Sequence, residues 1–82
     1  MITVVMPSVT HARLLGARLA TDTCVDFFVR GEEVTFEGSE GSLLDALTVK
    51  EWVFSLSFDD ACQHTGAMCF ASVYDRGTWD GR

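Results

Sequence analysis

The fold of this chain is decided by residues 24–37, which read CVDFFVRGEEVTFE. Two runs rich in Val and Phe flank Gly31-Glu32, and a glycine at the first position of a two-residue loop is what a type II′ β-turn requires. The sequence therefore predicts a β-hairpin in which the turn fixes the register and places Asp26 opposite Glu37. Because side chains alternate between the two faces of a strand, one face carries four apolar side chains and is expected to point to the core: Phe27, Val29, Val34 and Phe36.

The other face of this hairpin combines acids with an aromatic side chain. Asp26 opposite Glu37 places two like charges together, which costs a few tenths of a kcal/mol up to about 1 kcal/mol. Phe28 lies between this pair and an expected cross-strand ion pair of Arg30 with Glu33. An exposed aromatic ring surrounded by acids is typical of the anchor and rim of a protein contact surface. The alternative is that another segment of the chain covers Phe28 and that the acids only keep the protein soluble.

Upstream of the hairpin, the sequence predicts a strand followed by a helix. Residues 1–6 (MITVVM) form an apolar, β-branched run, which is typical of a strand buried on both faces. Pro7 stops this run, and Ser8 is expected to cap a helix over residues 8–20, where apolar residues recur at spacings of three and four.

Downstream, the sequence predicts a short helix and two further strands. Ser42 and Asp45 form a weak capping box for a helix over residues 42–47. Residues 51–58 alternate between bulky apolar and smaller side chains, which predicts a strand with one apolar face. Residues 67–74 are apolar on both faces and predict a last strand that needs cover on both sides, from helices or from a second copy of the chain.

These elements follow in the order β-α-β-β-α-β-β. This order predicts a single α+β domain over residues 1–82, in which an antiparallel or mixed sheet of about four or five strands packs against one longer and one short helix. Residues 76–82 are polar apart from Trp79 and are expected to form a flexible tail.

The charge of the chain is strongly negative and concentrated in its middle. Twelve Asp and Glu residues face six Lys and Arg residues, for a net charge of −6. The middle segment, residues 22–60, carries most of these acids, the opposite of what phosphate binding needs. Direct binding to nucleic acid is therefore disfavoured, and so is docking to an anionic membrane. Three cysteines without a CxxC pair fit a reducing compartment, so we expect a cytoplasmic protein, and the absence of Asn together with a single Lys suggests a GC-rich genome.

No motif in the sequence predicts an enzyme, a cofactor or a metal site. Cys62, His64 and Cys69 follow a C-x-H-x4-C spacing that matches no familiar zinc pattern, with Cys24 as the only further thiol. Pairs of Cys with His, and the adjacent Asp59-Asp60, occur by chance in chains of this composition and define no catalytic geometry. Neither a phosphate-binding GxxxxGK[ST] loop nor a GxGxxG turn is present.

These observations lead to two hypotheses about function. In the first, the protein is a small inhibitor, a mimic of DNA in its charge, that occupies a basic, nucleic-acid-binding surface of a partner protein in a bacterial cytoplasm. In size, acidity and composition the chain resembles phage-encoded inhibitors of bacterial defence, anti-CRISPR proteins among them, although this resemblance covers no motif and carries over no residue. In the second, the chain is a structural protein that forms a homodimer through residues 67–74, and its acidity serves solubility. The expected partner-binding residues are Asp26, Phe28, Glu32, Glu33, Glu37, Glu40, Asp59 and Asp60.

Overall fold

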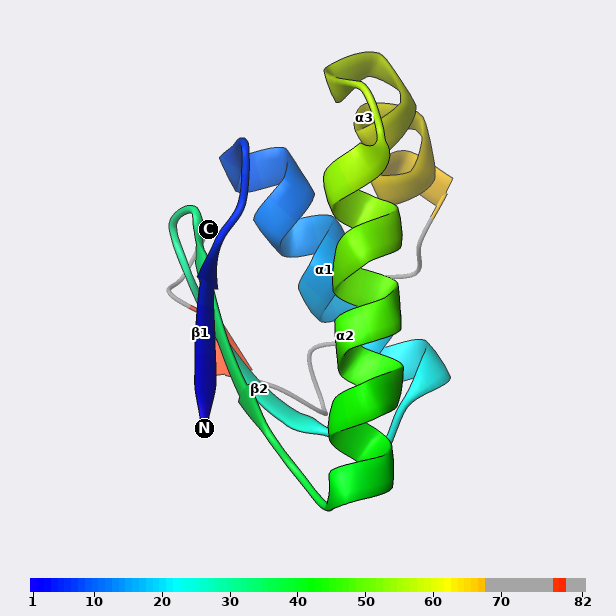
Figure 1. The fold of residues 1–82 in the computed structure, drawn as a ribbon. Coiled ribbons are helices and arrows are strands. Elements are labelled where there is room, and N and C mark those ends of the chain that lie inside the picture. The colour runs from blue at the N-terminus through cyan, green and yellow to red at the C-terminus, as the bar shows by residue number, and fades with distance from the viewer. Residues whose placement is uncertain (68–77, 80–82) are drawn as a thin grey trace.

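Three helices cover one face of a small β-sheet, which makes an α+β fold of two layers (Figure 1). The computed structural model describes residues 1–67 and 78–79. The elements are β1 (Ile2–Val5), α1 (Val9–Asp22), β2 (Asp26–Arg30), β3 (Glu33–Glu37), α2 (Glu40–Ser55), α3 (Phe58–Ala67) and β4 (Thr78–Trp79). The strands lie in the order β1-β3-β2-β4, where the first three are antiparallel and the two-residue β4 runs parallel to β2. The α+β class is confirmed, whereas the predicted strand count and element order are matched only in part.

The central hairpin has the predicted register at every pair. Asp26 lies opposite Glu37, and Val29 lies opposite Val34. Gly31 has a φ of 58° and is the one described residue with a positive φ, which is the pattern of a type II′ turn with its glycine first. The four apolar side chains that were expected to point to the core are buried. The turn and the alternation of buried side chains therefore indicate the same register of β2 against β3.

β1 is an edge strand, so the prediction that it is buried on both faces is wrong. It pairs antiparallel with β3, with Ile2 opposite Phe36 and Val5 opposite Glu33. The helices cover only one face of the sheet, and every second residue of β1 points to the other face. Val5 is consequently 63 % exposed, and Met1 before it is also exposed.

α1 is the predicted first helix, and it lies at the centre of the helix layer. The Ser8 hydroxyl caps it by accepting a hydrogen bond from the His11 backbone N–H at 3.1 Å. At its other end the Thr23 hydroxyl donates to the Leu19 carbonyl at 2.7 Å and accepts from the Val25 N–H at 3.2 Å. These side-chain bonds satisfy backbone groups that the helix leaves unpaired at its ends and turn the chain into β2.

α2 replaces two predicted elements, the short helix over residues 42–47 and the strand over residues 51–58. Its N-cap is Ser39 rather than Ser42, because the Ser39 hydroxyl accepts from the Ser42 N–H at 3.4 Å. Val53 is fully buried and Phe54 is 55 % exposed, which is the reverse of the predicted strand, where Phe54 belonged to the apolar face. The helical spacing of residues 46, 49 and 53 decides which side chains point inward.

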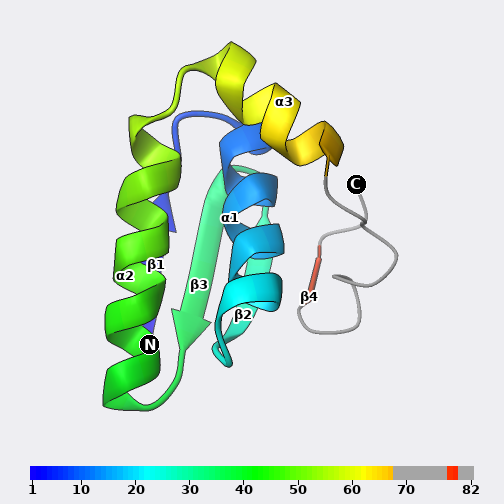
Figure 2. The same cartoon turned by 90° about the vertical axis from the view of Figure 1, so that its right-hand side faces the viewer.

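α3 begins at Phe58, the last residue of the predicted strand over 51–58, and continues through residues for which the sequence predicts a loop or a single helical turn. It packs against α1 and lies across one end of the helix layer (Figure 2). It runs as far as Ala67, so the predicted last strand cannot begin there. The rest of that strand, residues 68–74, lies outside the described residues, as does most of the predicted tail, of which only Thr78–Trp79 is described, beside β2.

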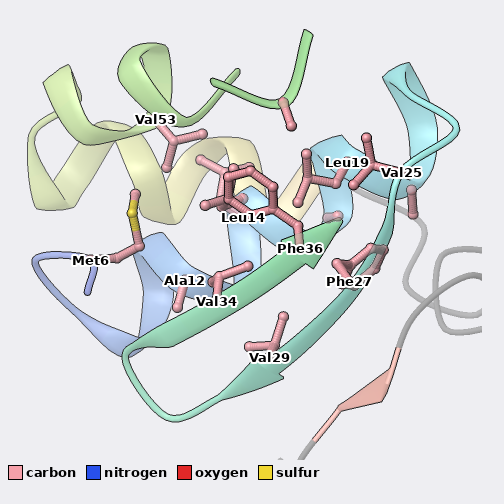
Figure 3. Close-up of a cluster of buried hydrophobic side chains, with 14 of the residues drawn as sticks. Met6, Ala12, Leu14, Leu19, Val25, Phe27, Val29, Val34, Phe36 and Val53 are labelled. Carbon is pink, nitrogen blue, oxygen red and sulfur yellow. The ribbon is translucent and has the colours of Figure 1, made fainter. Parts of the chain in front are cut away.

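The core lies between the sheet and the helices (Figure 3). Phe36 on β3 points toward Leu14 on α1, and Val53 reaches the same cluster from α2. All three side chains are fully buried, and burial of a side chain of this size stabilises the fold by about 1.5–3 kcal/mol. Since the core uses one face of the sheet only, the opposite face is left available for other roles.

Candidate protein-binding face

The face of the sheet that points away from the helices carries the candidate site, and we call it the open face. It comprises the outward side chains of β1, β3 and β2, which are Thr3, Val5, Glu33, Thr35, Glu37, Asp26, Phe28 and Arg30. In Figure 1 the sheet is seen edge-on, and all three helices lie on its other side. The open face is therefore set by strand alternation, and its composition follows from the sequence.

Asp26, Glu37 and Phe28 lie together on the open face, at the end of the hairpin away from its turn. The two carboxylates lie directly opposite each other on β2 and β3, and Phe28, next on the same face, is 38 % exposed. A surface cavity of about 160 Å³ joins them, lined also by Thr35, Met1 and Phe27. An acidic, partly aromatic hollow of this size can receive one side chain of a partner rather than a whole small molecule, which needs roughly 300 Å³ or more.

The acids of the open face form no ion pairs with other described residues. The predicted pair of Arg30 with Glu33 is wrong: the two residues lie opposite each other, but no ion pair forms between them. Flexible side chains on an exposed strand gain little from such a contact, because water screens the charges and pairing costs side-chain entropy. Asp26 and Glu37 are likewise unpaired within the described part of the chain. The negative charge of this face therefore remains available to a partner.

β1 extends the open face with side chains that carry no charge. The hydroxyls of Thr3 and Thr35 form a hydrogen bond of 2.8 Å across the two strands. Val5 projects beside them and is mostly exposed. The face thus has an acidic half on β2 and β3 and a neutral, partly apolar half on β1.

Of the other expected partner-binding residues, Glu33 lies on this face beside the hairpin turn, and the remaining four lie off it. Glu32 occupies the hairpin turn, and Glu40 lies in the first turn of α2, three residues after Glu37. Asp59 and Asp60 lie in the first turn of α3, which belongs to the helix layer (Figure 2). All eight expected residues are exposed, but they do not form one surface.

Several of these remaining acids have a local role in their helices. The Asp60 carboxylate accepts from the Ser57 hydroxyl at 2.9 Å, and the same hydroxyl accepts from the Asp60 N–H at 3.2 Å, which makes a capping pair at the start of α3. Asp59 and Glu40 lie in first turns, where the helix dipole favours negative charge. Folding therefore accounts for these acids, whereas it does not account for Asp26 and Glu37.

The cysteines and histidines do not assemble into a reactive or metal-binding group among the described residues. Cys24 and Cys62 are exposed free thiols, and Cys69 lies outside the described part of the chain. His11 is buried, and its ring contacts the Ser8 hydroxyl and the Leu56 carbonyl, the latter at 3.0 Å. With both ring nitrogens engaged in these contacts, His11 serves to connect α1 to the segment that joins α2 and α3.

Sequence reasoning missed the apolar side chains that the helix layer exposes. Leu44 is 62 % exposed, and Phe54 and Phe58 are exposed to a similar extent. The alternation over residues 51–58 places Phe54 and Phe58 on the apolar face of a predicted strand, and Leu44 falls in the predicted short helix. The signal that could have placed them is the helical spacing of residues 46, 49 and 53, on the opposite side of α2.

The comparisons with known proteins add no family to this description. No family model matches the chain, and no curated protein and no solved structure matches it. Among the helices that the structure describes, none combines the length and the apolar character needed to cross a bilayer.

Proposed function

We propose that this protein is a small inhibitor that binds a basic surface of a partner protein through the acidic half of its open face. That basic surface would otherwise hold nucleic acid, and the proposed setting is the cytoplasm of a bacterial host, as for phage-encoded inhibitors of defence systems. The observation that carries the proposal is the Asp26–Glu37 pair beside the exposed ring of Phe28.

The energetics of this pair support a role outside folding. Two like charges directly opposite each other on an antiparallel pair destabilise it, and no cation among the described residues lies within ion-pair distance of either carboxylate. Asp60, by contrast, is bonded within its own helix. A carboxylate pair that opposes folding and projects from an otherwise ordinary sheet is best explained by a ligand that neutralises it.

The chemistry of the hollow favours a lysine or arginine side chain as that ligand. Two carboxylates can accept hydrogen bonds from an ammonium or guanidinium group, and Phe28 offers an aromatic face for a cation–π contact. The net charge of −6 would in addition steer the protein toward a basic surface and raise the rate of association. Surfaces rich in such side chains are those that hold nucleic-acid phosphates.

Capture of partners from a lysate of a GC-rich bacterium tests the proposal. Wild type is compared with Asp26→Lys/Glu37→Lys and with the control Asp45→Lys/Glu51→Lys, which makes the same change of charge at exposed positions of α2. Wild type and control are expected to retain a nucleic-acid-binding protein at low salt and to release it when duplex DNA is added. The hairpin variant is expected to lose it.

Two results would count against the proposal. If both double variants lose the partner equally, net charge and not the open face drives binding. If the hairpin variant captures everything that wild type captures, the acids serve solubility, as the second hypothesis holds.

A further inference from the structure

The free edge of β1 is the strongest unassigned feature of the molecule. β1 is the outermost strand on its side of the sheet, and Figure 1 looks onto this edge, with β1 in front of the other strands. An edge strand presents unpaired backbone groups to solvent, and natural proteins normally protect such edges with Lys, Pro, a bulge or an inward-pointing charge. Residues 2–5 contain no Lys, Pro or charged side chain, and the edge-protecting feature that β1 has is its short length of four residues.

The hydrogen-bonding pattern shows which backbone groups are free. The Met6 N–H donates to the Glu32 carbonyl at 2.8 Å, so Met6 forms a hydrogen-bonded pair with β3. In an antiparallel ladder such pairs alternate with non-bonded pairs. Val4 therefore bonds to β3, whereas the N–H and C=O groups of Thr3 and Val5 point away from the sheet. The short contact between the Thr3 and Thr35 hydroxyls is consistent with a non-bonded pair at this position, because side chains approach most closely in such pairs.

The side chains of β1 are complementary to those of a second β1. If two copies pair antiparallel about a two-fold axis at Thr3, then Thr3 lies opposite its own counterpart. On the open face Val5 then lies opposite Met1 of the second copy, and on the helix side Ile2 lies opposite Val4. Val5 and Met1 are exposed, and Ile2 and Val4 are only half-buried in one copy, so each pairing removes apolar surface from water.

From these observations we infer that β1 pairs with β1 of a second copy of this chain, in the antiparallel register centred on Thr3. Thr3 exchanges backbone hydrogen bonds with its counterpart, and the Val5 N–H donates to the Met1 carbonyl of the second copy. A charged partner strand is a poorer occupant, because it would find no opposite charge along residues 2–5. The pairing does not depend on what binds the acidic half of the open face.

This pairing would join two open faces into one continuous surface. Five strand spacings separate the two copies of β2, which is about 24 Å across the strands. The two-fold axis also offsets the two copies of Asp26 by four residues, about 13 Å along the strands, so these outward acids lie roughly 27 Å apart. The acidic pairs would then flank a neutral centre made by the two copies of β1.

Sedimentation equilibrium under reducing conditions tests the pairing, since the reductant removes any dimer linked through Cys24 or Cys62. Wild type is compared with Val5→Lys, which puts a charge on the free edge, and with the control Leu44→Lys. Val5 and Leu44 are 63 % and 62 % exposed, so the two variants lose almost the same apolar surface. We expect the dissociation constant of the dimer to rise at least about tenfold in Val5→Lys and to stay unchanged in Leu44→Lys.

Two further measurements keep the inference falsifiable if Val5→Lys perturbs the fold. Val5→Pro removes one outward N–H and leaves the ladder with β3 intact, so it should weaken the dimer in a protein with an unchanged circular dichroism spectrum. In amide exchange followed by NMR, Thr3 and Val5 should become protected as the protein concentration rises, while Val4 is protected throughout. A protein that stays monomeric at millimolar concentration, or a dimer in which Thr3 and Val5 remain unprotected, would overturn the inference.

Discussion

A single buried histidine connects the start of the helix layer to its end. The His11 ring lies against the Ser8 hydroxyl on one side and 3.0 Å from the Leu56 carbonyl on the other. Leu56 lies 45 residues away in sequence, between α2 and α3. The two contacts hold the turn between those helices against the N-terminal end of α1.

Replacing this histidine is expected to destabilise the fold. His11→Leu puts an apolar side chain of similar size in place of the ring and leaves the part-buried Leu56 carbonyl without its donor, which is expected to cost about 1–2 kcal/mol of unfolding free energy. His64→Leu is the control, because His64 is exposed and contacts only the edge of Trp52 among the contacts described. The loss of unfolding free energy in His64→Leu should stay below about 1 kcal/mol. Urea unfolding measures both, and equal losses would show that the contact to Leu56 stabilises nothing.

The hairpin turn depends on one glycine with a left-handed backbone. Gly31 has a φ of 58°, whereas Gly41 lies in the first turn of α2 without such a φ, and a Cβ added at either position meets no atom within 4 Å. Gly31→Ala should therefore lower the unfolding free energy by about 1–2 kcal/mol, while Gly41→Ala should leave it equal or raise it by up to about 1 kcal/mol. Thermal unfolding separates the two, and a neutral Gly31→Ala would mean that the turn can change its type.

At the scale of elements, the prediction from the sequence differs most from the structure in α2. Large apolar side chains alternate over residues 51–58 as in a strand: Trp52, Phe54, Leu56 and Phe58. This alternation favours a strand, although the structure has a helix through residue 55. The helical pattern in the same segment uses smaller side chains, Ala46 and Val53, which are the two fully buried ones in α2. Leu44 and Phe54 lie on the exposed side of α2, and the positions of such large apolar side chains mislead an argument from hydrophobicity alone.

Substitution at two neighbouring positions distinguishes the helix from the predicted strand. Val53→Asp puts a charge into the core and is expected to remove more than about 3 kcal/mol of unfolding free energy, because no partner is present there. Phe54→Asp changes an exposed side chain and should cost about 1 kcal/mol or less. In the predicted strand the order would be reversed, since Phe54 would then face the core. Guanidinium unfolding of both variants checks the order.

The hairpin and α1 could be predicted because their signals are local. In the hairpin the position of Gly31 fixes the turn, the turn fixes the register, and the register fixes which side chains face the core. The capping serine of α1 lies directly before its apolar stripe. The edge position of β1 and the single covered face of the sheet depend instead on how the elements pack, which no local pattern encodes.

At the scale of the whole molecule, the acids divide into two kinds. Those of the hairpin strands, Asp26, Glu33 and Glu37, lie on the open face, as the register predicts. Asp59 and Asp60 share with them only their negative charge and their place in the acidic segment 22–60. They lie in α3, which belongs to the helix layer. A Ser-x-x-Asp pattern at Ser57 and Asp60 could have indicated their capping role.

One comparison tests most directly whether the open face serves a partner. It measures how the unfolding free energy changes when one charge is removed from an acid of the open face and one from an acid that caps a helix. Asp26→Asn keeps the shape of the side chain and ends its repulsion with Glu37, so the unfolding free energy should rise by a few tenths of a kcal/mol up to about 1 kcal/mol. Asp60→Asn weakens the cap of α3 and should lower it by about 0.3–1 kcal/mol. Urea unfolding at low salt would support a binding role if the two changes have opposite signs. A loss of stability in Asp26→Asn would contradict it, because the carboxylate would then be explained by folding alone.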